Sequence, residues 1–246
     1  MGKNLINANI QSLRLLKEAG VTDNLNEFPI NRFNIKESFK NEDIENNSQT
    51  MNLKTEQQLL KIQDLKELQR FINNFKGCAL YKEANNVVFS DGNPNSKIML
   101  IGEAPGHDED IEGKPFVGRS GKLLDKMLNA IDLDREKVYI ANIIPWRPPV
   151  NRKPTENEIE ICLPLIHKHI ELINPKVLLL LGSTSTYALL KDKTPITKIR
   201  GKWFTLNING KNIQAMPTFH PAFLLRQQKQ KKYVWKDLQN IRDSIK

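Results

Sequence analysis

The sequence predicts an α/β fold in which helices cover both faces of a mostly parallel sheet. Short apolar runs alternate along the chain with segments of helical periodicity, a pattern typical of parallel sheets. Hydrophobic residues make up 39% of the 246 residues, which is enough for one sizeable core. No internal repeat interrupts this alternation.

The first expected element is a helix over residues 55–75, because Thr55 and Gln58 form a capping-box pattern and apolar residues then recur at helical spacing. The expected strands are Lys97–Gly102, Val138–Ile144 and Val177–Gly182, and the expected helices are Gly118–Ile131, Thr155–Ile173, Ser183–Leu190 and Tyr233–Ile245. Thr155 and Glu158 form a second capping-box pattern. Pro164 is expected to kink its helix or to delay the start of that helix.

Two further strands, Trp203–Asn207 and Asn212–Met216, are expected to form a hairpin, because Asn209-Gly210 lies between them. In open α/β sheets, ligands bind beyond the carboxyl ends of the strands. Functional residues are therefore expected in the stretches that directly follow the parallel strands.

Residues 1–54 are predicted to be an N-terminal extension, and residues 55–246 to be the folded domain. The extension is rich in Asn, Lys and Glu. Its apolar cluster from Leu13 to Val21 is expected to form a short helix. The stretch Asn34–Asn52 is polar and mixed in charge, so we expect a partly disordered linker there.

The net charge of +9 favours a polyanionic partner such as nucleic acid, although a Lys-rich surface on an ordinary soluble protein fits it equally well. The two cysteines, Cys78 and Cys162, exclude a disulfide framework and a zinc site, and they indicate a reducing, cytoplasmic location. The longest apolar run, Val177–Leu181, is far shorter than the ~20 residues that span a bilayer. No membrane partner and no signal peptide are expected.

The first stretch that carries chemistry is Gly102–Gly106, directly after an expected strand. It continues through Glu109 and Asp110 to Phe116–Gly121. Glycines after a strand let the backbone come close to a ligand. A nucleotide-binding turn is the alternative, but the G-x-G-x-x-G pattern is absent. The stretch therefore predicts a ligand pocket of another kind.

Two further stretches follow the next strand. Asn142 stands at the strand end, where an Asn is also a common turn former. The segment Trp146–Pro154 carries three cations, and its prolines fix an extended loop. This loop is either a rigid linker or a clamp for a phosphate backbone.

The last stretch is Phe219–Arg226, which contains His220. A lone His is more often structural than catalytic. Leu224 and Leu225 are expected to be exposed beside Arg226. That arrangement suits a wedge that fills the gap left by a flipped base, with the arginine on a phosphate.

In this order, the motifs resemble those of the family 4 uracil-DNA glycosylases. The matching stretches are GEAPG at 102–106, FVGRSG at 116–121, NIIPWRPPVNRKP at 142–154 and HPAFLLR at 220–226. The resemblance covers about residues 75–246. It implies a three-layer α/β/α sandwich with a short, mostly parallel central sheet. It also implies a repair enzyme that flips uracil out of single- or double-stranded DNA and hydrolyses the N-glycosidic bond. The enzyme is expected to be a monomer.

The resemblance assigns three residues to the base itself. Phe116 is expected to stack on the flipped uracil. Asn142 is expected to accept a hydrogen bond from N3–H and to donate one to O4, a pattern that cytosine does not match. His220 is expected to stabilise negative charge on O2 as the bond breaks.

Other roles follow from the same resemblance. Glu103 and Glu109 are expected to line the pocket and to affect catalysis, with Glu109 also crowding the C5 edge. Asn151 is expected to hold the attacking water or the leaving base. Ala104 stands where other branches of the superfamily have a water-activating Asp, and Gly106 completes the base pocket. The expected DNA contacts are Arg119, Ser120, Arg147, Arg152, Leu224, Leu225 and Arg226.

The chain departs from the family at its cofactor. The family usually ligates a 4Fe–4S cluster with four cysteines, of which Cys78 and Cys162 match, whereas Phe75 and Trp146 occupy the other two positions. We therefore expect no cluster and no metal, the competing possibility being a cluster shared across a dimer.

Two alternative functions remain at this stage. One is the same fold acting mainly on another deaminated base such as hypoxanthine. The other is a catalytically inactive module that binds uracil-containing DNA or single strands. A DNA-crosslinking branch of the superfamily is not favoured, because Pro148–Pro154 stands where that branch has a basic insertion ending in His.

Overall fold

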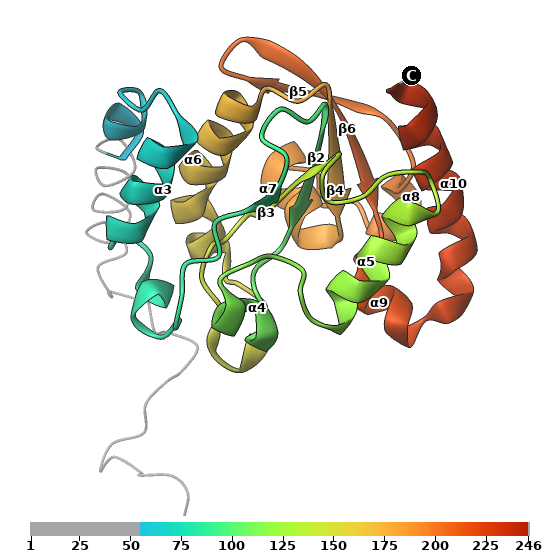
Figure 1. Cartoon of the computed structure of the whole chain (residues 1–246), viewed down its shortest axis with the longest axis horizontal. Coiled ribbons are helices and arrows are strands. Elements are labelled where there is room, and N and C mark those ends of the chain that lie inside the picture. Colours follow the sequence, from blue (N-terminus) through green and yellow to red (C-terminus); the bar gives the residue numbers. More distant parts are fainter. Residues whose placement is uncertain (1–54, 246) are drawn as a thin grey trace, which may run out of the picture. The chain divides into compact units, whose positions relative to one another are not determined.

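The structure is a computed structural model that describes residues 55–245 (Figure 1). The predicted N-terminal extension, with its short helix and its linker, lies outside the described residues. No helix within the described residues is long and apolar enough to cross a bilayer.

One six-stranded sheet forms the centre of the domain, in the order β1-β3-β2-β4-β6-β5. The strands are β1 (Asp91–Gly92), β2 (Ile98–Gly102), β3 (Tyr139–Asn142), β4 (Val177–Leu181), β5 (Phe204–Ile208) and β6 (Lys211–Thr218). The inner strands β3, β2, β4 and β6 are parallel to one another. The edge strands β1 and β5 are antiparallel to their neighbours. The prediction of a mostly parallel sheet is confirmed.

Helices cover both faces of this sheet (Figure 1). The α-helices are α3 (Leu65–Asn74), α4 (His107–Glu112), α5 (Arg119–Asn129), α6 (Glu156–Ile173), α7 (Ser183–Leu190), α8 (Ile196–Ile199), α9 (Pro221–Arg226) and α10 (Lys231–Ser244). Short 3-10 helices lie at η1 (Ala79–Lys82), η2 (Pro149–Asn151) and η3 (Gln228–Gln230).

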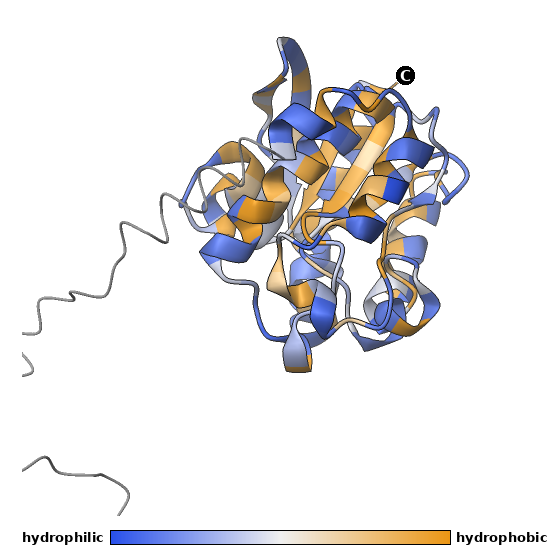
Figure 2. Cartoon of the chain, turned by 90° about the vertical axis from the view of Figure 1, so that its left-hand side faces the viewer, coloured by the Kyte–Doolittle hydropathy of each residue, from blue (hydrophilic) through white to orange (hydrophobic). Residues whose placement is uncertain are grey.

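Two hydrophobic clusters, one on each face of the sheet, account for the three layers. Because side chains alternate along a strand, Met99 and Ile101 of β2 enter one cluster while Ile98 and Leu100 enter the other. The first cluster joins the sheet to α3, α6 and α7, and the second joins it to α5, α9 and α10. In Figure 2, the strands at the centre of the domain are mostly coloured as hydrophobic. The predicted α/β/α sandwich is confirmed.

The predicted helix over residues 55–75 is wrong in one respect, because the helix breaks. Residues 55–59 are helical, and a new helix, α3, begins at Leu65. Asp64 caps this second helix by accepting from the Glu67 N–H at 2.8 Å, and the Glu67 carboxylate accepts from the Gln63 N–H at 2.8 Å. These two capping hydrogen bonds start a helix in the middle of a continuous apolar period.

The other expected elements lie within a few residues of their predicted bounds. Pro164 does not delay its helix, since α6 begins at Glu156 after the capping box of Thr155 and Glu158. The hairpin has the expected Asn209-Gly210 tip, with φ of 49° and 83° at these two residues. The sequence did not predict the short helices α4, α8 and α9, nor the edge strand β1. After the strand that ends at Gly102, the first expected helix began at Gly118, so α4 was not expected.

Candidate active site

The residues singled out by the motifs lie at one edge of the sheet, where parallel strands end. Gly102 closes β2, Asn142 closes β3, and His220 follows β6 by two residues. The β2–β3 pairing places Gly102 directly beside Asn142. These motif residues therefore lie at the carboxyl ends of the strands, where functional residues were expected.

Asn142 has a buried side-chain oxygen with no partner. The residue is 6% exposed, and among the described residues its Oδ1 is the buried side-chain N or O atom that lacks a hydrogen bond. A buried polar atom without a partner costs roughly 1–3 kcal/mol, so such an atom calls for a ligand or a water. A Cβ on Gly102 would lie 2.3 Å from this oxygen. Glycine therefore keeps the approach to Oδ1 free of side chain.

Phe116 supplies a flat wall beside this oxygen. Its ring is buried, and its centroid lies 5.5 Å from that of His220 with an interplanar angle of 32°. The tip of the ring lies next to Gly102, because a Cβ there would come within 2.7 Å of Phe116 Cζ. The backbone φ of Phe116 is 57°, in the left-handed region that non-glycine residues rarely adopt.

His220 is held as a neutral imidazole with a defined donor. Its Nδ1 accepts a hydrogen bond from the Ala222 N–H at 3.1 Å. Burial, and then the charge of Arg226, lowers the pKa of His220 to about 4. A neutral ring that accepts at Nδ1 carries its proton on Nε2, so the ring offers one N–H donor. Gly182 allows the β4–α7 turn to pass close to this ring, since its φ is 96° and a Cβ there would lie 3.0 Å from His220 Cβ.

Together these groups suit a flat polar ring. A buried acceptor on Asn142, an aromatic wall at Phe116 and a neutral donor on His220 converge at the same edge of the sheet. The matching ligand is a planar heterocycle that has an N–H beside carbonyl oxygens.

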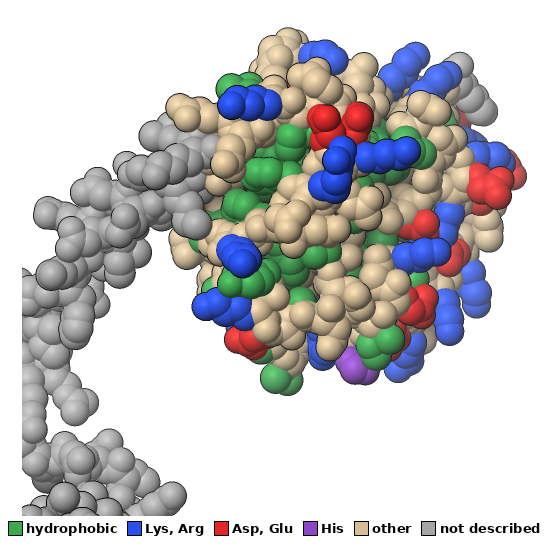
Figure 3. All heavy atoms as spheres, turned by 60° about the vertical axis from the view of Figure 1, so that its left-hand side comes forward, with side chains coloured by type: hydrophobic (Ala, Val, Ile, Leu, Met, Phe, Trp, Pro, Cys, Tyr) green, Lys and Arg blue, Asp and Glu red, His purple; other side chains and the backbone are tan. Residues whose placement is uncertain are grey.

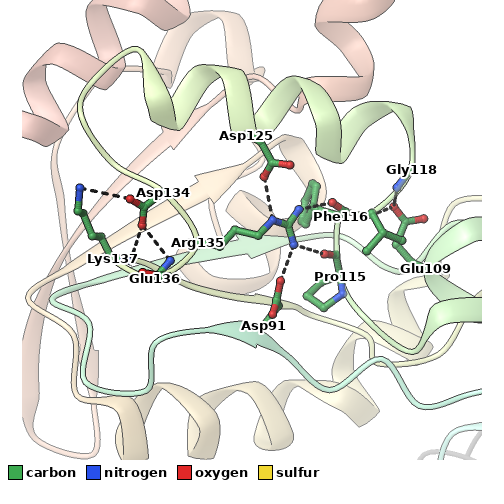
Figure 4. Close-up of polar contacts among 11 residues, drawn as sticks. Asp91, Glu109, Pro115, Phe116, Gly118, Asp125, Asp134, Arg135, Glu136 and Lys137 are labelled. Carbon is green, nitrogen blue, oxygen red and sulfur yellow. Dashed lines mark hydrogen bonds and ion pairs between the residues drawn. The ribbon is translucent and has the colours of Figure 1, made fainter.

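Glu109 holds the pocket loops rather than presenting a free carboxylate. It is 8% exposed, and its carboxylate accepts from the N–H groups of Gly106, Val117 and Gly118 at 3.0–3.1 Å. Figure 4 shows this carboxylate directed at the backbone of Gly118. A Cβ on Gly106 would lie 2.7 Å from Glu109 Oε2, so a side chain at this position would displace the carboxylate. The carboxylate therefore ties the two Gly-rich segments of the first motif together.

Glu103 has a partner that the sequence did not predict. The hydroxyl of Thr184, the second residue of α7, donates to Oε2 of Glu103. The two segments meet because β2 and β4 are neighbours in the sheet. A Ser/Thr-rich helix start carries no distinctive signal in a single sequence, which explains why Thr184 was missed. Ala104, next along the chain, is half-buried and packs on the core.

Arg147 is engaged within the chain, and its expected contact with DNA stays a prediction. Its side chain is 23% exposed, and Arg147 Nε donates to Asn151 Oδ1 at 2.7 Å. Arg147 Nη1 lies 3.1 Å from His107 Nδ1 and 3.9 Å from the buried carboxylate of Asp110. Arg147 thus fixes Asn151 against the start of α4 and leaves the amide NH2 of Asn151 available.

Arg152 is also engaged within the chain. Its guanidinium makes two hydrogen bonds to the Glu158 carboxylate, at 2.9 and 2.6 Å. Such a bidentate pair fixes the guanidinium, while the Arg152 side chain stays 42% exposed, so its expected contact with DNA stays a prediction. Arg119 and Arg226 are exposed, and Ser120 is half-buried at the start of α5.

The expectation that both leucines of the last motif are exposed is wrong for Leu224. This residue is 1% exposed and belongs to the core cluster formed with α5 and α10. The two leucines face different ways because they are adjacent on the short helix α9. Leu225 is half-buried and remains available for a contact outside the chain. Another apolar side chain, Val150, is 92% exposed on the Pro-rich loop and has a φ of 53°.

The positive net charge does not form a continuous patch on every face. On the face drawn in Figure 3, Lys and Arg side chains are interspersed with Asp and Glu. Pairs such as Arg152 with Glu158 and Lys168 with Glu171 use part of the basic charge within the chain.

A compact apolar group stands where the four cluster cysteines of the resembled family were expected. The rings of Phe75 and Trp146 stack with centroids 6.1 Å apart and an interplanar angle of 19°. Cys78 and Cys162 are both 0% exposed. A hydrogen bond between the thiols lowers the pKa of Cys78, and burial raises the pKa of Cys162 well above its ordinary value. No group of three or more His, Cys, Asp or Glu side chains suited to a metal occurs among the described residues.

Comparison with known proteins shows which protein family this chain is similar to. A model of the uracil DNA glycosylase superfamily matches residues 89–241. The chain is 44% identical over 173 residues to a type-4 uracil-DNA glycosylase of Saccharolobus solfataricus, which is 68% of this chain and 80% of that protein. It is 39% identical over 184 residues to that of Sulfurisphaera tokodaii (73% and 84%). It is also 39% identical over 175 residues to that of Thermotoga maritima (69% and 88%).

Proposed function

The chain belongs to the uracil-DNA glycosylase superfamily and, within it, to the type-4 enzymes, and from that premise we propose that Asn142, Phe116 and His220 bind a uracil flipped out of DNA. The protein is a DNA repair enzyme, a hydrolase that acts on N-glycosyl bonds. An inactive DNA-binding module is therefore no longer a competing interpretation.

The reaction breaks the bond between C1′ of the deoxyribose and N1 of uracil. The bonding electron pair leaves with the base, and a water oxygen forms the new bond to C1′. That water loses a proton to solvent, and the departing uracil anion takes one up. Uracil and an abasic site in an otherwise intact strand are the products.

The observation that carries the proposed role of Asn142 is its unpartnered, buried Oδ1. Uracil presents N3–H as a donor, which satisfies this oxygen, and O4 as an acceptor for the side-chain NH2. Cytosine has no proton at N3 and carries an NH2 group at position 4, so both contacts would be lost. Mispaired buried polar groups cost roughly 1–3 kcal/mol each, which supports discrimination against cytosine.

The neutral His220 supports leaving-group stabilisation. As the C1′–N1 bond breaks, negative charge develops on uracil O2, and a donor already oriented by the Ala222 N–H needs little reorganisation. One preorganised donor of this kind contributes roughly 3 kcal/mol to the transition state. Phe116 supports the same step by fixing the plane of the base.

The residues around the sugar have supporting roles in this proposal. Ala104 carries no titratable group where other branches of the superfamily have an Asp, so the reaction depends on stabilising the leaving base. Asn151, oriented by Arg147, holds the water or the base with its free NH2. Glu103 stabilises the positively charged sugar that forms as the base leaves, and Glu109 positions the loops.

DNA is the substrate, and we propose that it is held at the mouth of the pocket by Arg119, Ser120, Leu225 and Arg226. Their exposed or half-buried positions at the start of α5 and on α9 support these contacts. Leu225 acts as the wedge in paired DNA, since Leu224 is part of the core. We further propose that the enzyme acts as a monomer in the cytoplasm on both single- and double-stranded DNA.

We also propose that the enzyme works without an iron–sulfur cluster. A 4Fe–4S cluster needs four thiolate ligands, and this chain has only Cys78 and Cys162. The stacked rings of Phe75 and Trp146 fill the adjacent volume with apolar surface. The residues present therefore do not fit the cluster, and no step of the reaction is assigned to it.

The direct test is alkaline cleavage of oligonucleotides after incubation with the protein. Strands containing uracil, hypoxanthine or thymine, paired and unpaired, would be compared at equal enzyme concentration. Cleavage at uracil alone is expected. Asn142→Asp should lower kcat/KM for uracil about 10- to 100-fold, because the carboxylate cannot donate to O4 and repels the uracil anion.

Asn129→Asp, an exposed substitution at the end of α5, is the matched control and should be neutral. Unchanged uracil cleavage by Asn142→Asp would overturn the recognition role. Preferential cleavage at hypoxanthine would support the alternative substrate.

A further inference from the structure

Arg135 lies in the turn between α5 and β3, outside every motif that the proposed function uses. Its guanidinium reaches two consecutive carbonyl groups of the pocket loop, donating to the oxygen of Pro115 at 3.1 Å and to that of Phe116 (Figure 4). These residues are 20 and 19 positions away in the sequence. The contact therefore links the turn after α5 to the loop that carries Phe116.

Two carboxylates hold the guanidinium in place. Asp91 accepts from Nη1 at 2.6 Å, and Asp125 accepts from Nε at 2.8 Å. Burial lowers the pKa of Arg135, but these carboxylates outweigh it and raise the pKa above its ordinary value. A planar guanidinium can serve four acceptors in fixed directions, which the single ammonium of lysine cannot do.

The loop needs such a clamp because Phe116 has a strained backbone. Its φ of 57° lies in the left-handed region, where a non-glycine residue costs roughly 1–3 kcal/mol and persists only when its surroundings impose it. Gly121 belongs to the same arrangement, since a Cβ there would lie 1.7 Å from the Phe116 oxygen. On the other side, the Glu109 carboxylate binds the N–H groups of Val117 and Gly118. The Arg135 guanidinium therefore binds the carbonyl groups of Pro115 and Phe116, and the Glu109 carboxylate binds the N–H groups of the two residues that follow.

We propose that Arg135 is a positioning residue for base recognition, which holds Phe116 in its left-handed conformation so that the ring stays beside His220. The inference rests on the proposed stacking of Phe116 on the flipped base. Arg135 itself touches neither base nor DNA, and it acts through the peptide carbonyl of Phe116.

The test is a double-mutant cycle with two readouts, the single-turnover cleavage rate and the inhibition constant of free uracil. Arg135→Gln should weaken both about 10- to 100-fold, because a small displacement of a positioning group has effects of this size. Arg135→Lys should give an intermediate loss. In a Phe116→Ala background, the same Arg135 substitutions should change either readout by less than about twofold, since the ring that they displace is absent.

Arg242→Gln is the matched control, because Arg242 forms an ion pair with the adjacent Asp243 on α10 and lies outside the site. It should leave both readouts unchanged. An equal loss on Arg135→Gln in the wild-type and Phe116→Ala backgrounds would overturn the inference, because the effect would then not pass through the ring.

The outcomes also separate this inference from the proposed function. If Phe116→Ala is harmful but Arg135→Gln is not, only the positioning role fails. If Phe116→Ala is harmless, the stacking role fails, and the inference fails with it. Should Arg135→Gln not fold, Asp125→Asn removes one carboxylate partner and should give a smaller loss, about threefold, that also disappears in the Phe116→Ala background.

Discussion

The hydroxyl of Thr184 donates a hydrogen bond to the carboxylate of Glu103, although 81 positions separate the two residues. The contact joins the start of α7 to the end of β2, across neighbouring parallel strands. A hydrogen bond to a charged acceptor is stronger than a neutral one and fixes its direction. Glu103 is thereby oriented from a segment that belongs to none of the four motifs.

Removing this hydroxyl should slow the reaction without unfolding the protein. Thr184→Val keeps the shape of the side chain but leaves the Glu103 carboxylate free to rotate. We therefore expect kcat to fall roughly tenfold with little change in KM. A tenfold loss corresponds to a hydrogen bond to a charged group of about 1.5 kcal/mol. Thr184→Ser restores the hydroxyl and should restore most of the rate. Steady-state kinetics on a uracil oligonucleotide measure both. Equal losses for Val and Ser would show that packing, rather than the hydrogen bond, matters at this position.

The sequence predicted the residues proposed to contact the base better than those that hold them. Asn142 and His220 follow strands, and the order of a parallel sheet brings strand ends together. Thr184 acts through one hydrogen bond and Arg135 through two hydrogen bonds to the Phe116 loop, all between distant segments, and such pairings leave no local pattern in one sequence. The hydrogen bonds between Glu109 and two Gly-rich segments likewise depend on those segments meeting in space.

The residues predicted to contact DNA show the same limit. A leucine pair beside an arginine predicts a wedge, but only the helix phase of α9 decides that Leu224 enters the core. Arg147 and Arg152 were predicted to face DNA because their loop is basic. Both also have acidic partners within the protein, Asp110 and Glu158, which the basic loop alone does not predict.

The pH dependence of cleavage should show no ionisation of His220 near neutrality. Burial lowers the pKa of His220 to about 4, so the ring stays neutral from pH 8 down to pH 5 and gains its proton only as the pH falls through about 4. Single-turnover rates over this range should therefore show no inflection near 6.5 that depends on His220. His220→Ala should lower the rate about 100-fold at every pH, consistent with the loss of roughly 3 kcal/mol from one donor.

The comparison of the two pH profiles is the decisive measurement. An inflection near pH 6.5 in the wild type that disappears in His220→Ala would contradict a neutral donor, because it would show that the cationic ring is the active form. A loss of DNA affinity in His220→Ala with an unchanged cleavage rate would instead make His220 a DNA contact.

The two leucines of α9 should respond differently to truncation. Leu225→Ala should reduce cleavage of paired U·A more than cleavage of single-stranded uracil, because only the paired base must leave a stack at a cost of a few kcal/mol. Leu224→Ala should lower the free energy of unfolding by about 2–5 kcal/mol and affect both substrates alike, since it leaves a cavity in the core. Equal losses on both substrates for Leu225→Ala would exclude the wedge role.

The buried cysteines should be dispensable for activity. Cys78 and Cys162 are both 0% exposed, and the stacked rings of Phe75 and Trp146 lie in the same core cluster. A cluster shared across a dimer would need both thiols to reach a second copy of the chain, which their burial opposes. Burying a Phe-sized side chain contributes roughly 1.5–3 kcal/mol, so packing can replace metal ligation as the source of stability.

The purified protein is therefore expected to contain no stoichiometric iron and to lack the visible absorbance of iron–sulfur centres. Cys78→Ser and Cys162→Ser should each keep uracil cleavage close to the wild-type rate. Iron that copurifies in stoichiometric amount and is lost with activity in either variant would show that the remaining thiols still hold a cluster.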